Sequence, residues 1–267
     1  MEFKEIIFQN KKGIAVITLN RPDVRNAITG HEMLSEIESA CNIVNDNRDI
    51  KVLIITGADP AFSSGGNIKD MAAKKGMFQG TPTQIMINYK RNVQRIPVAV
   101  NNVEVPTIAA VNGAAIGAGL DLALMCDMRV ASTKAKFGET FLNVGLIPGD
   151  GGAYFLPRVV GMAKACELTF TGDIIDAATA REIGLVNYVV EHENLLEKAN
   201  ELASKIATKP SEALRMSKRL LYMAQSSTLP YLLEQSAAFQ ALCHHSDDHQ
   251  EALSAIFEKR EPNYSGK

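Results

Sequence analysis

Residues 108–128 read IAAVNGAAIGAGLDLALMCDM. The stretch consists of an apolar run, a turn rich in glycine and alanine, and a second apolar run. Thr107 to Val111 has the length and character of a strand buried on both faces, which favours parallel pairing between layers of helices. A helix is expected from about Gly117 to Cys126. Small residues let backbone N–H groups approach a ligand, and a helix start favours negative charge. The stretch predicts a strand, a tight turn and a helix able to receive an anionic group.

A second glycine-rich turn, residues 61–69 (AFSSGGNIK), follows another continuous apolar run, Val52 to Thr56. N–H groups from two such turns can together form an oxyanion hole. The dinucleotide-binding fingerprint is excluded, because Leu122 occupies the position of its third glycine.

The flanking segments predict an α/β core. Residues 3–8 and 13–19 are expected to form paired strands around a turn at 10–13, and residues 128–131 a further short strand. Apolar residues recur at helical spacing between Thr29 and Asn45. Residues 74–83, with two glycines and a proline, are expected to form a flexible connection.

Strand signals end at Leu195, and the remainder predicts amphipathic helices punctuated by proline. We therefore divide the chain into an α/β core, residues 1–194, and a helical region, residues 195–267. The four predicted helices run from Leu195 to Ile206, Ser211 to Ala224, Leu229 to Leu242 and Asp247 to Lys259.

The composition is that of an ordinary globular protein. Of 267 residues, 46% are hydrophobic and 22% are charged, which excludes a disordered chain. With a net charge of −2, the chain lacks the excess of lysine and arginine that is typical of nucleic-acid-binding proteins. The longest uncharged stretch is too short and too rich in glycine for a membrane span. A chain of this mass should fold to roughly 11,000 Å² of accessible surface.

The cysteines and the amino terminus favour the cytoplasm. Cys41, Cys126, Cys166 and Cys243 have no CxxC spacing, and buried free thiols are the simplest interpretation. The chain begins MEFKE, without a hydrophobic signal region.

The histidines of residues 244–249 (HHSDDH) resemble metal ligands, but a helix start capped by Ser246 or Asp247 explains the pattern better. No metal site is expected.

Taken together, these motifs resemble the signature of the crotonase (enoyl-CoA hydratase/isomerase) family. Besides residues 108–128, the ordered matches span nearly the whole chain. They are LNRP at 19–22, NAI at 26–28, FSSGGNIK at 62–69, VGLIP at 144–148, LPR at 156–158, TG at 171–172, AREIGLV at 180–186 and FEKR at 257–260.

The resemblance implies a spiral core of ββα repeats and a carboxyl-terminal helical region for trimerisation, with a homotrimer or a dimer of trimers as the assembly. It implies an acyl-CoA thioester as substrate. Coenzyme A is part of that substrate, so no separate cofactor is expected, and neither nucleic acid nor membrane is an expected partner.

Carried over by position, the oxyanion hole is formed by the N–H groups of Gly66 and Ala118, which stabilise the enolate more than the bound ground state. The family pattern also places residues along the substrate. Asn67 stands where the family usually has aspartate. The residues so implied are Ala27, Ser64, Asn67, Ile68, Lys69, Phe141 and, from a neighbouring subunit, Lys259.

The acid positions depart from the pattern. Hydratases of this family typically use two glutamates, and the first of them falls at Asp121, still a carboxylate. The second falls at Phe141, and a phenyl ring cannot transfer a proton. Glu139 and Asp150 are the two acids able to substitute. Glu139 shares a face with Phe141 if the segment is extended, and Asp150 lies one position after the catalytic acid of several family isomerases.

Three functions remain open from the sequence. The first is an enoyl-CoA hydratase with a rearranged acid pair. The second is a double-bond isomerase or related enzyme with one acid/base, and the third is an acyl-CoA-binding member with little turnover.

Overall fold

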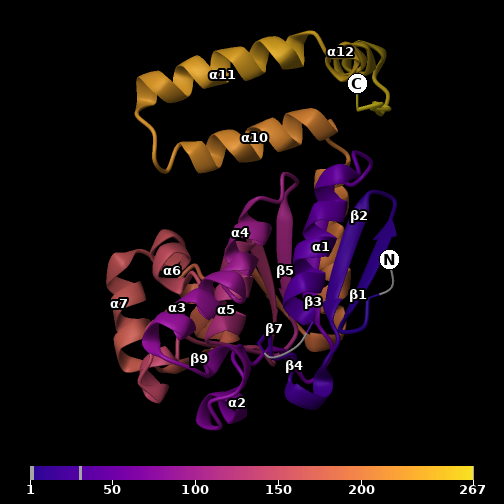
Figure 1. The fold of residues 1–267 in the computed structure, drawn as a ribbon. Coiled ribbons are helices and arrows are strands. Elements are labelled where there is room, and N and C mark those ends of the chain that lie inside the picture. The colour runs from indigo at the N-terminus through magenta and orange to yellow at the C-terminus, as the bar shows by residue number, and fades with distance from the viewer. Residues whose placement is uncertain (1–2, 30–31, 267) are drawn as a thin grey trace.

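The computed structural model describes residues 3–29 and 32–266, which form two β-sheets packed among helices (Figure 1). The larger sheet has the strand order β1-β2-β3-β5-β7-β10. Only the β1–β2 hairpin pairs antiparallel among its described strands. These strands span Ile6–Lys11, Ile14–Leu19, Val52–Gly57, Thr107–Val111, Met128–Ser132 and Tyr188–Val190.

Helices cover both faces of the larger sheet and extend beyond it. Those up to residue 171 are α1 (Met33–Asp46), α2 (Ile68–Ala72), α3 (Pro82–Arg91), α4 (Arg95–Asn101), α5 (Ala118–Met125), α6 (Gly152–Val160) and α7 (Met162–Thr171). Those that follow are α8 (Ala177–Glu182), α9 (Leu195–Ala207), α10 (Ser211–Met223), α11 (Leu229–His244) and α12 (Asp247–Glu258).

The two central strands are buried on both faces, as the sequence predicts. Successive side chains of a strand point to opposite faces. On β3, Leu53 and Ile55 belong to the large core that includes α1 and α5, whereas Val52 and Ile54 pack with α9. The sheet therefore has a helical layer on each side.

The smaller sheet has four short strands in the order β4-β6-β8-β9. Its strands span Ala61–Ser63, Ala114–Ile116, Lys136–Gly138 and Ile174–Asp176. β4, β6 and β8 follow β3, β5 and β7 of the larger sheet along the chain, and helices follow each pair. This repetition is the expected ββα spiral, and it places three connections side by side.

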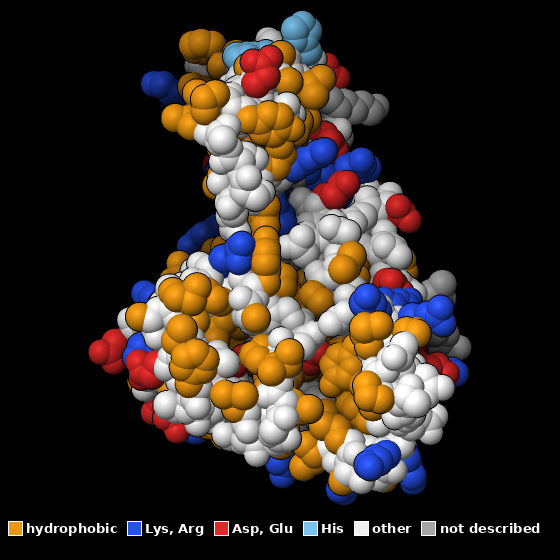
Figure 2. All heavy atoms as spheres, turned by 60° about the vertical axis from the view of Figure 1, so that its left-hand side comes forward, with side chains coloured by type: hydrophobic (Ala, Val, Ile, Leu, Met, Phe, Trp, Pro, Cys, Tyr) orange, Lys and Arg blue, Asp and Glu red, His pale blue; other side chains and the backbone are white. Residues whose placement is uncertain are grey.

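Helices α11 and α12 stand apart from the body, with α10 between α11 and the body (Figure 1), and hydrophobic side chains gather on that outlying part (Figure 2). Helix α10 is tied to the body, because the buried Lys218 donates to the Val105 carbonyl at 2.9 Å and pairs with Asp127 at 2.9 Å. Helix α9 contacts β2, β3, β5 and β7. The proposed domain boundary at residue 195 thus precedes a helix that packs on the sheet. No described helix is both long and apolar enough to cross a membrane.

Some predicted segments differ from the observed structure. Strand β1 covers residues 6–11 rather than 3–8, because the N–H groups of Lys4 and Glu5 bond to the Glu36 carboxylate instead of a neighbouring strand. The expected flexible connection, residues 74–83, contains the 3₁₀ turn Gly76–Phe78 and the start of α3. Residues 30 and 31 of the helix predicted from Thr29 lie outside the described residues.

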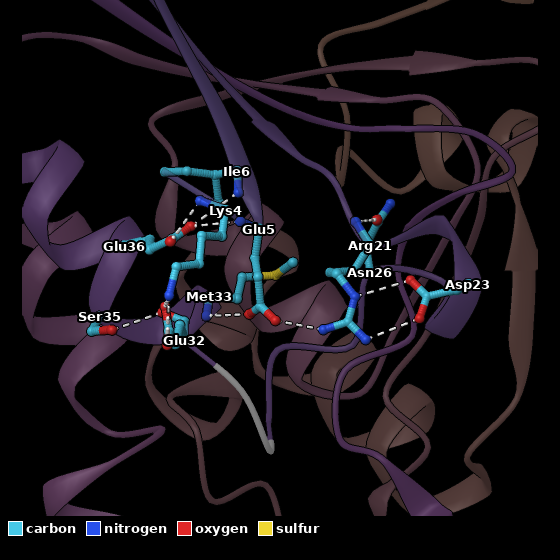
Figure 3. Close-up of polar contacts among 10 residues, drawn as sticks. All are labelled: Lys4, Glu5, Ile6, Arg21, Asp23, Asn26, Glu32, Met33, Ser35 and Glu36. Atoms are coloured by element: carbon cyan, nitrogen blue, oxygen red, sulfur yellow. Dashed lines mark hydrogen bonds and ion pairs between the residues drawn. The ribbon is translucent and has the colours of Figure 1, made fainter. Parts of the chain in front are cut away.

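A buried carboxylate ties the first strand to α1 (Figure 3). The Glu36 carboxylate accepts hydrogen bonds from the N–H groups of Lys4, Glu5 and Ile6 at 2.8, 2.8 and 3.1 Å. The Glu5 side chain accepts from Met33 N–H at 2.6 Å, so the anchoring is reciprocal. These bonds satisfy backbone donors at the starts of β1 and α1.

We expect Glu36→Gln to lower the free energy of unfolding by about 2 kcal/mol, because a neutral amide cannot serve three buried donors as a carboxylate does. Urea denaturation measures the change. Glu197→Gln is the matched control, since Glu197 also lies in the first turn of its helix but is exposed. Equal stability of the two variants would contradict the anchoring role.

Candidate active site

The first glycine-rich turn, residues 63–66, is held by the segment that follows β2. Ser63 Oγ donates to the Asn26 carbonyl at 2.7 Å, and the Gly65 carbonyl accepts from Ile28 N–H at 2.8 Å. Asn26 is completely buried and has a φ of 55°. The NAI motif at 26–28 therefore supports the conformation of this turn from behind.

The second glycine-rich turn is fixed by Asn112 and by Gly117. Asn112 Oδ1 accepts from Gly57 N–H at 3.2 Å, and its amide nitrogen donates to Asp59 Oδ1 at 2.9 Å. Gly117 has φ 53° and ψ −123°, a conformation that glycine adopts readily and other residues do not. Helix α5 begins at the next residue, so its first N–H groups are presented at the end of the turn.

The two turns are in direct backbone contact. A Cβ atom added to Gly119 would lie 2.1 Å from the Ser63 carbonyl oxygen, and one added to Gly65 would lie 2.9 Å from Ala118 N. Only glycine permits this approach. The N–H groups of Gly66 and Ala118 donate to no described residue. Two free amides from different turns therefore lie in one region.

Asp121 and Glu139 bring their carboxylates together beside the start of α6. A Cβ atom added to Gly152 would lie 2.3 Å from Glu139 Oε1 and 2.4 Å from Asp121 Oδ1. The two oxygens are therefore no farther apart than the sum of those distances. Both side chains are buried, and none of their four oxygens has a hydrogen-bond partner of ordinary geometry among the described residues. Asp121 lies one helical turn after Ala118, on the same side of α5.

The environment favours protonation of this pair. Burial, and then the charges of Glu139 and Asp150, raise the pKa of Asp121 well above its ordinary value. Burial raises the pKa of Glu139 to about 7; interaction with Asp121 opposes that rise and the charge of Asp150 adds to it. Two carboxylates this close cannot both ionise easily, so they hold a proton between them near neutral pH.

Asp150 is the third buried acid of the site. It is 6% exposed, and its Oδ1 has no partner among the described residues. Burial raises the pKa of Asp150 to about 6. The half-buried Tyr89 of α3 lies against the preceding residue, with ring atom Cε1 3.3 Å from the Cβ position of Gly149.

Phe141 does not lie with the acids. It begins the 3₁₀ turn Phe141–Val144, and its ring lies 3.7 Å from the Cβ position of Gly117, beside the two free amides. The segment after β8 is therefore not extended, and the argument that Glu139 shares a face with Phe141 is wrong. Glu139 nevertheless reaches Asp121, because it follows β8 directly and turns inward before the 3₁₀ turn begins.

The residues expected along the substrate fall into two places. Ala27 is buried and Ser64 Oγ donates to the Val24 carbonyl, both behind the first turn. Asn67 caps α2 by accepting from Lys69 N–H at 3.0 Å, and Ile68 is 64% exposed beside it.

Lys259, in contrast, caps the end of α12 on the outlying helices, away from α2 and β4 (Figure 1). The single chain does not bring Lys259 to the site.

The histidine segment behaves as a helix start. Ser246 Oγ accepts from His249 N–H at 3.2 Å, which is an N-cap of α12. His244 and His249 pair through ring nitrogens 3.2 Å apart. Across residues 3–29 and 32–266, no three histidine, cysteine or acidic side chains are grouped to hold a metal.

Comparison with known proteins decides the family. The family model described as enoyl-CoA hydratase/isomerase matches residues 9–267. The chain belongs to this family. A crotonyl-CoA hydratase from Syntrophomonas wolfei is 35% identical over 268 residues and the match covers 100% of both chains. A 1,2-epoxyphenylacetyl-CoA isomerase from Escherichia coli is 34% identical, again over 100% of both. The chain is thus an acyl-CoA-processing enzyme with the crotonase fold.

Solved hydratases of the family have the same fold. The enoyl-CoA hydratase of Bacillus anthracis superimposes with a TM-score of 0.92 at 33% identity, covering 99% of this chain and 100% of that one. Sequence reasoning about this family member missed Gly152 and Tyr89. The glycine pair after Asp150 was a usable signal for the first, whereas nothing in residues 82–91 marked Tyr89.

The raised pKa of Glu139 makes the active site a source of instability at high pH. Because the folded protein binds this proton more tightly than the unfolded chain, its stability falls as pH rises from the ordinary pKa of 4.5 towards about 7. Glu139→Gln should therefore stabilise the protein at pH 8 by on the order of 2–3 kcal/mol, and less at pH 5. Urea denaturation at both pH values measures this, with exposed Glu182→Gln as control. A variant no more stable than the native protein at pH 8 would refute the account.

Proposed function

We propose that this enzyme is an enoyl-CoA hydratase that adds water to a 2-enoyl-CoA through the acid pair Asp121 and Glu139. The observation that carries the proposal is that both carboxylates meet over Gly152, buried and with no other hydrogen-bond partner within residues 3–29 and 32–266. Hydration needs one group to accept a proton from water and one to donate a proton to carbon. A pair that holds one proton near neutral pH supplies both forms at once.

The proposed reaction begins with the thioester carbonyl accepting hydrogen bonds from the N–H groups of Gly66 and Ala118. One carboxylate of the acid pair takes a proton from water as the water oxygen bonds to C3. The C2=C3 electrons move towards the carbonyl, and the amides stabilise the resulting enolate oxygen. The protonated partner then delivers its proton to C2. The amides gain strength as negative charge develops, which is the condition for catalysis.

The remaining substrate contacts are assigned by position. Asn67, Ile68 and Lys69, at the exposed start of α2, would line the coenzyme A channel. Ala27 and Ser64 would form the wall behind the first turn. Phe141, whose ring lies beside Gly117, would cover the thioester and exclude water from the amides.

We expect Glu139→Gln and Asp121→Asn each to lower kcat for crotonyl-CoA hydration by about 10²–10⁴-fold, the usual contribution of general acid–base catalysis. Loss of enoyl absorbance follows the reaction. Asp173→Asn, an exposed acid before β9, is the matched control. Binding of acetoacetyl-CoA by calorimetry should persist in both variants, because the backbone amides remain. Native rates in both would overturn the assignment of the pair.

Isomerisation is the second candidate, and Phe141 favours it. The side chain at the second glutamate position cannot transfer a proton, and the 1,2-epoxyphenylacetyl-CoA isomerase matches this chain over its full length. In that case the acid pair would shuttle one proton between two carbons. Faster conversion of a 3-enoyl-CoA than hydration of the matching 2-enoyl-CoA would establish the isomerase instead.

The active protein is proposed to be a homotrimer or a dimer of trimers. No residue of helix α11 is buried, and its exposed side chains include the large apolar Leu229, Tyr231 and Leu233. The accessible surface of 13901 Å² exceeds the roughly 11,000 Å² typical of a monomer of this mass. Large apolar side chains exposed together on one part of a molecule mark an interface. A neighbouring copy would also be able to bring Lys259 to the coenzyme A phosphates.

Light scattering should give the native protein a mass of three or six times 29.0 kDa. Leu233→Glu combined with Phe257→Glu should lower the mass, because both side chains are more than half exposed on the outlying helices. Ile7→Glu, a comparable substitution on β1, is the control. A native monomer at micromolar concentration would contradict the assembly.

The cytoplasm is the compartment that we propose. All four cysteines are free, and Cys41 and Cys126 are buried, as is usual where thiols stay reduced.

A further inference from the structure

His192 links segments that are far apart in the sequence. It begins the 3₁₀ turn His192–Asn194, between β10 and α9. Its Nδ1 lies 3.2 Å from Ser132 Oγ, and its Nε2 lies 3.1 Å from Asp59 Oδ2. The other oxygen of Asp59, Oδ1, accepts from the Asn112 amide at 2.9 Å. These four side chains therefore form one continuous chain of hydrogen bonds, which we call the His192 network.

The donors and acceptors of the His192 network fit one arrangement of protons. Burial opposes ionisation of Asp59, but the hydrogen bonds from Asn112 and His192 outweigh it and lower the pKa of Asp59. Asp59 is therefore an acceptor, and His192 Nε2 carries the hydrogen that is donated to it. In the neutral imidazole, Nδ1 then accepts from the Ser132 hydroxyl, whose oxygen also accepts from Lys134 N–H at 3.0 Å. Each member thus has a defined partner on both sides.

A serine, a histidine and an acid in this order also occur in enzymes with a serine nucleophile. Ser132, however, has no exposed surface, so no substrate can reach its hydroxyl. The side chains of His192 and Asp59 are 23% and 61% exposed, and an ion pair this accessible adds little to stability. The network is therefore neither a nucleophilic site nor a major source of stability, and its effect lies in which parts of the chain it holds together.

The His192 network crosses the three connections that run from the larger sheet to the smaller one. Asp59 lies between β3 and β4, Asn112 lies between β5 and β6, and Ser132 is the last residue of β7 before β8. The neighbouring strands β4, β6 and β8 begin shortly after these positions and pair with one another. Asp59 and Asn112 join the first two connections directly. His192 is the member that joins the third connection to them.

Each of these short strands leads to a group of the candidate active site. β4 leads to Gly66, β6 leads to Ala118, and β8 leads directly to Glu139. Three residues of a strand span only roughly 10 Å, so the position of each connection is carried almost directly to the group beyond it. The first two connections are also in backbone contact, because a Cβ atom added to Gly113 would lie 2.3 Å from the Pro60 carbonyl oxygen. The third connection has the His192 network in place of such a contact with them.

We propose that His192 is a positioning residue for the reaction, which aligns the strand that carries Glu139 with the strands that carry the two free amides. The inference rests on the proposed function, because it concerns the placement of the acid pair relative to the thioester carbonyl. A misplacement of about 1 Å between reacting groups can lower a rate by roughly 10²-fold. Binding of the ground state depends less on this alignment than the transition state does.

Two conservative substitutions each remove one side of the His192 network. His192→Gln places an amide near the position of Nε2 and keeps the bond to Asp59, whereas His192→Asn places one near Nδ1 and keeps the bond to Ser132. Because the third connection is joined to the others only through both bonds, we expect each variant to lower kcat for crotonyl-CoA hydration by about 10-fold, with KM changed by about twofold or less. Glu193→Gln is the matched control, since Glu193 is an exposed residue of the same 3₁₀ turn.

Steady-state kinetics well below the midpoint of thermal unfolding separates positioning from stability. A merely structural role would lower that midpoint and leave kcat of the folded variants unchanged, which would overturn the proposal. Native kcat in either variant, or a loss that lies in KM alone, would overturn it as well. If His192 acts through Glu139, then His192→Gln should cause no further loss of kcat in a protein that already carries Glu139→Gln. A further 10-fold loss in that background would contradict the proposed route.

The native protein shows whether the proposed function itself has failed. If it converts a 3-enoyl-CoA faster than it hydrates crotonyl-CoA, the same variants are compared in that isomerisation, because the acid pair and the amides serve both reactions. Conversion of neither substrate would overturn the proposed function together with this inference. Rapid turnover by the native protein that both His192 variants retain would overturn this inference alone.

Discussion

The contact between Gly119 and the Ser63 carbonyl is the constraint on which the site depends. With a Cβ position only 2.1 Å from that oxygen, Gly119 lets the first turn of α5 lie directly against the end of β4. This contact joins two turns that leave different sheet connections. The free amides of Gly66 and Ala118 are brought together by it, and Asp121 follows one helical turn later. No side chain could produce the same alignment, because the donors are backbone atoms whose positions are fixed by the sheets.

Stabilising and destabilising interactions are distributed unevenly around this contact. Strands β3 and β5 are completely buried and hydrogen-bonded, and Glu36 serves three backbone donors at the edge of the sheet. In the site, Asp121 and Glu139 lie buried at the start of α6, and their oxygens accept no hydrogen bond from the part of the chain that the structure describes. A helix amino terminus offsets part of the cost of placing negative charge there. The stable layers thus support a region whose charges oppose folding, which is the usual trade between stability and catalysis.

Much of the fold could be predicted from the sequence, because long apolar runs indicate its central strands and helices. The runs at 52–56 and 107–111 are strands buried on both faces, and the helical spacing before Asn45 places Met33, Ile37 and Val44 in the core.

The three-residue strands of the smaller sheet could not be predicted. Such segments have too few side chains for a period, and tertiary pairing alone defines them. Helix α3 could not be predicted for a related reason. No residue of α3 is buried, so its sequence has no apolar stripe that faces the core.

The acid pair shows where sequence reasoning reaches its limit and what the structure adds. Alignment with the family pattern places the second acid at Phe141, so a chain with phenylalanine there looks deficient. The two-residue displacement to Glu139 is compensated in space, because the chain turns between these residues: Glu139 continues inward from β8 while Phe141 starts a 3₁₀ turn beside Gly117. Gly152 makes this possible, since any side chain there would occupy the space of both carboxylates. Under the proposed function, the second acid therefore stands two positions earlier in the chain, while its carboxylate still meets that of Asp121 at Gly152.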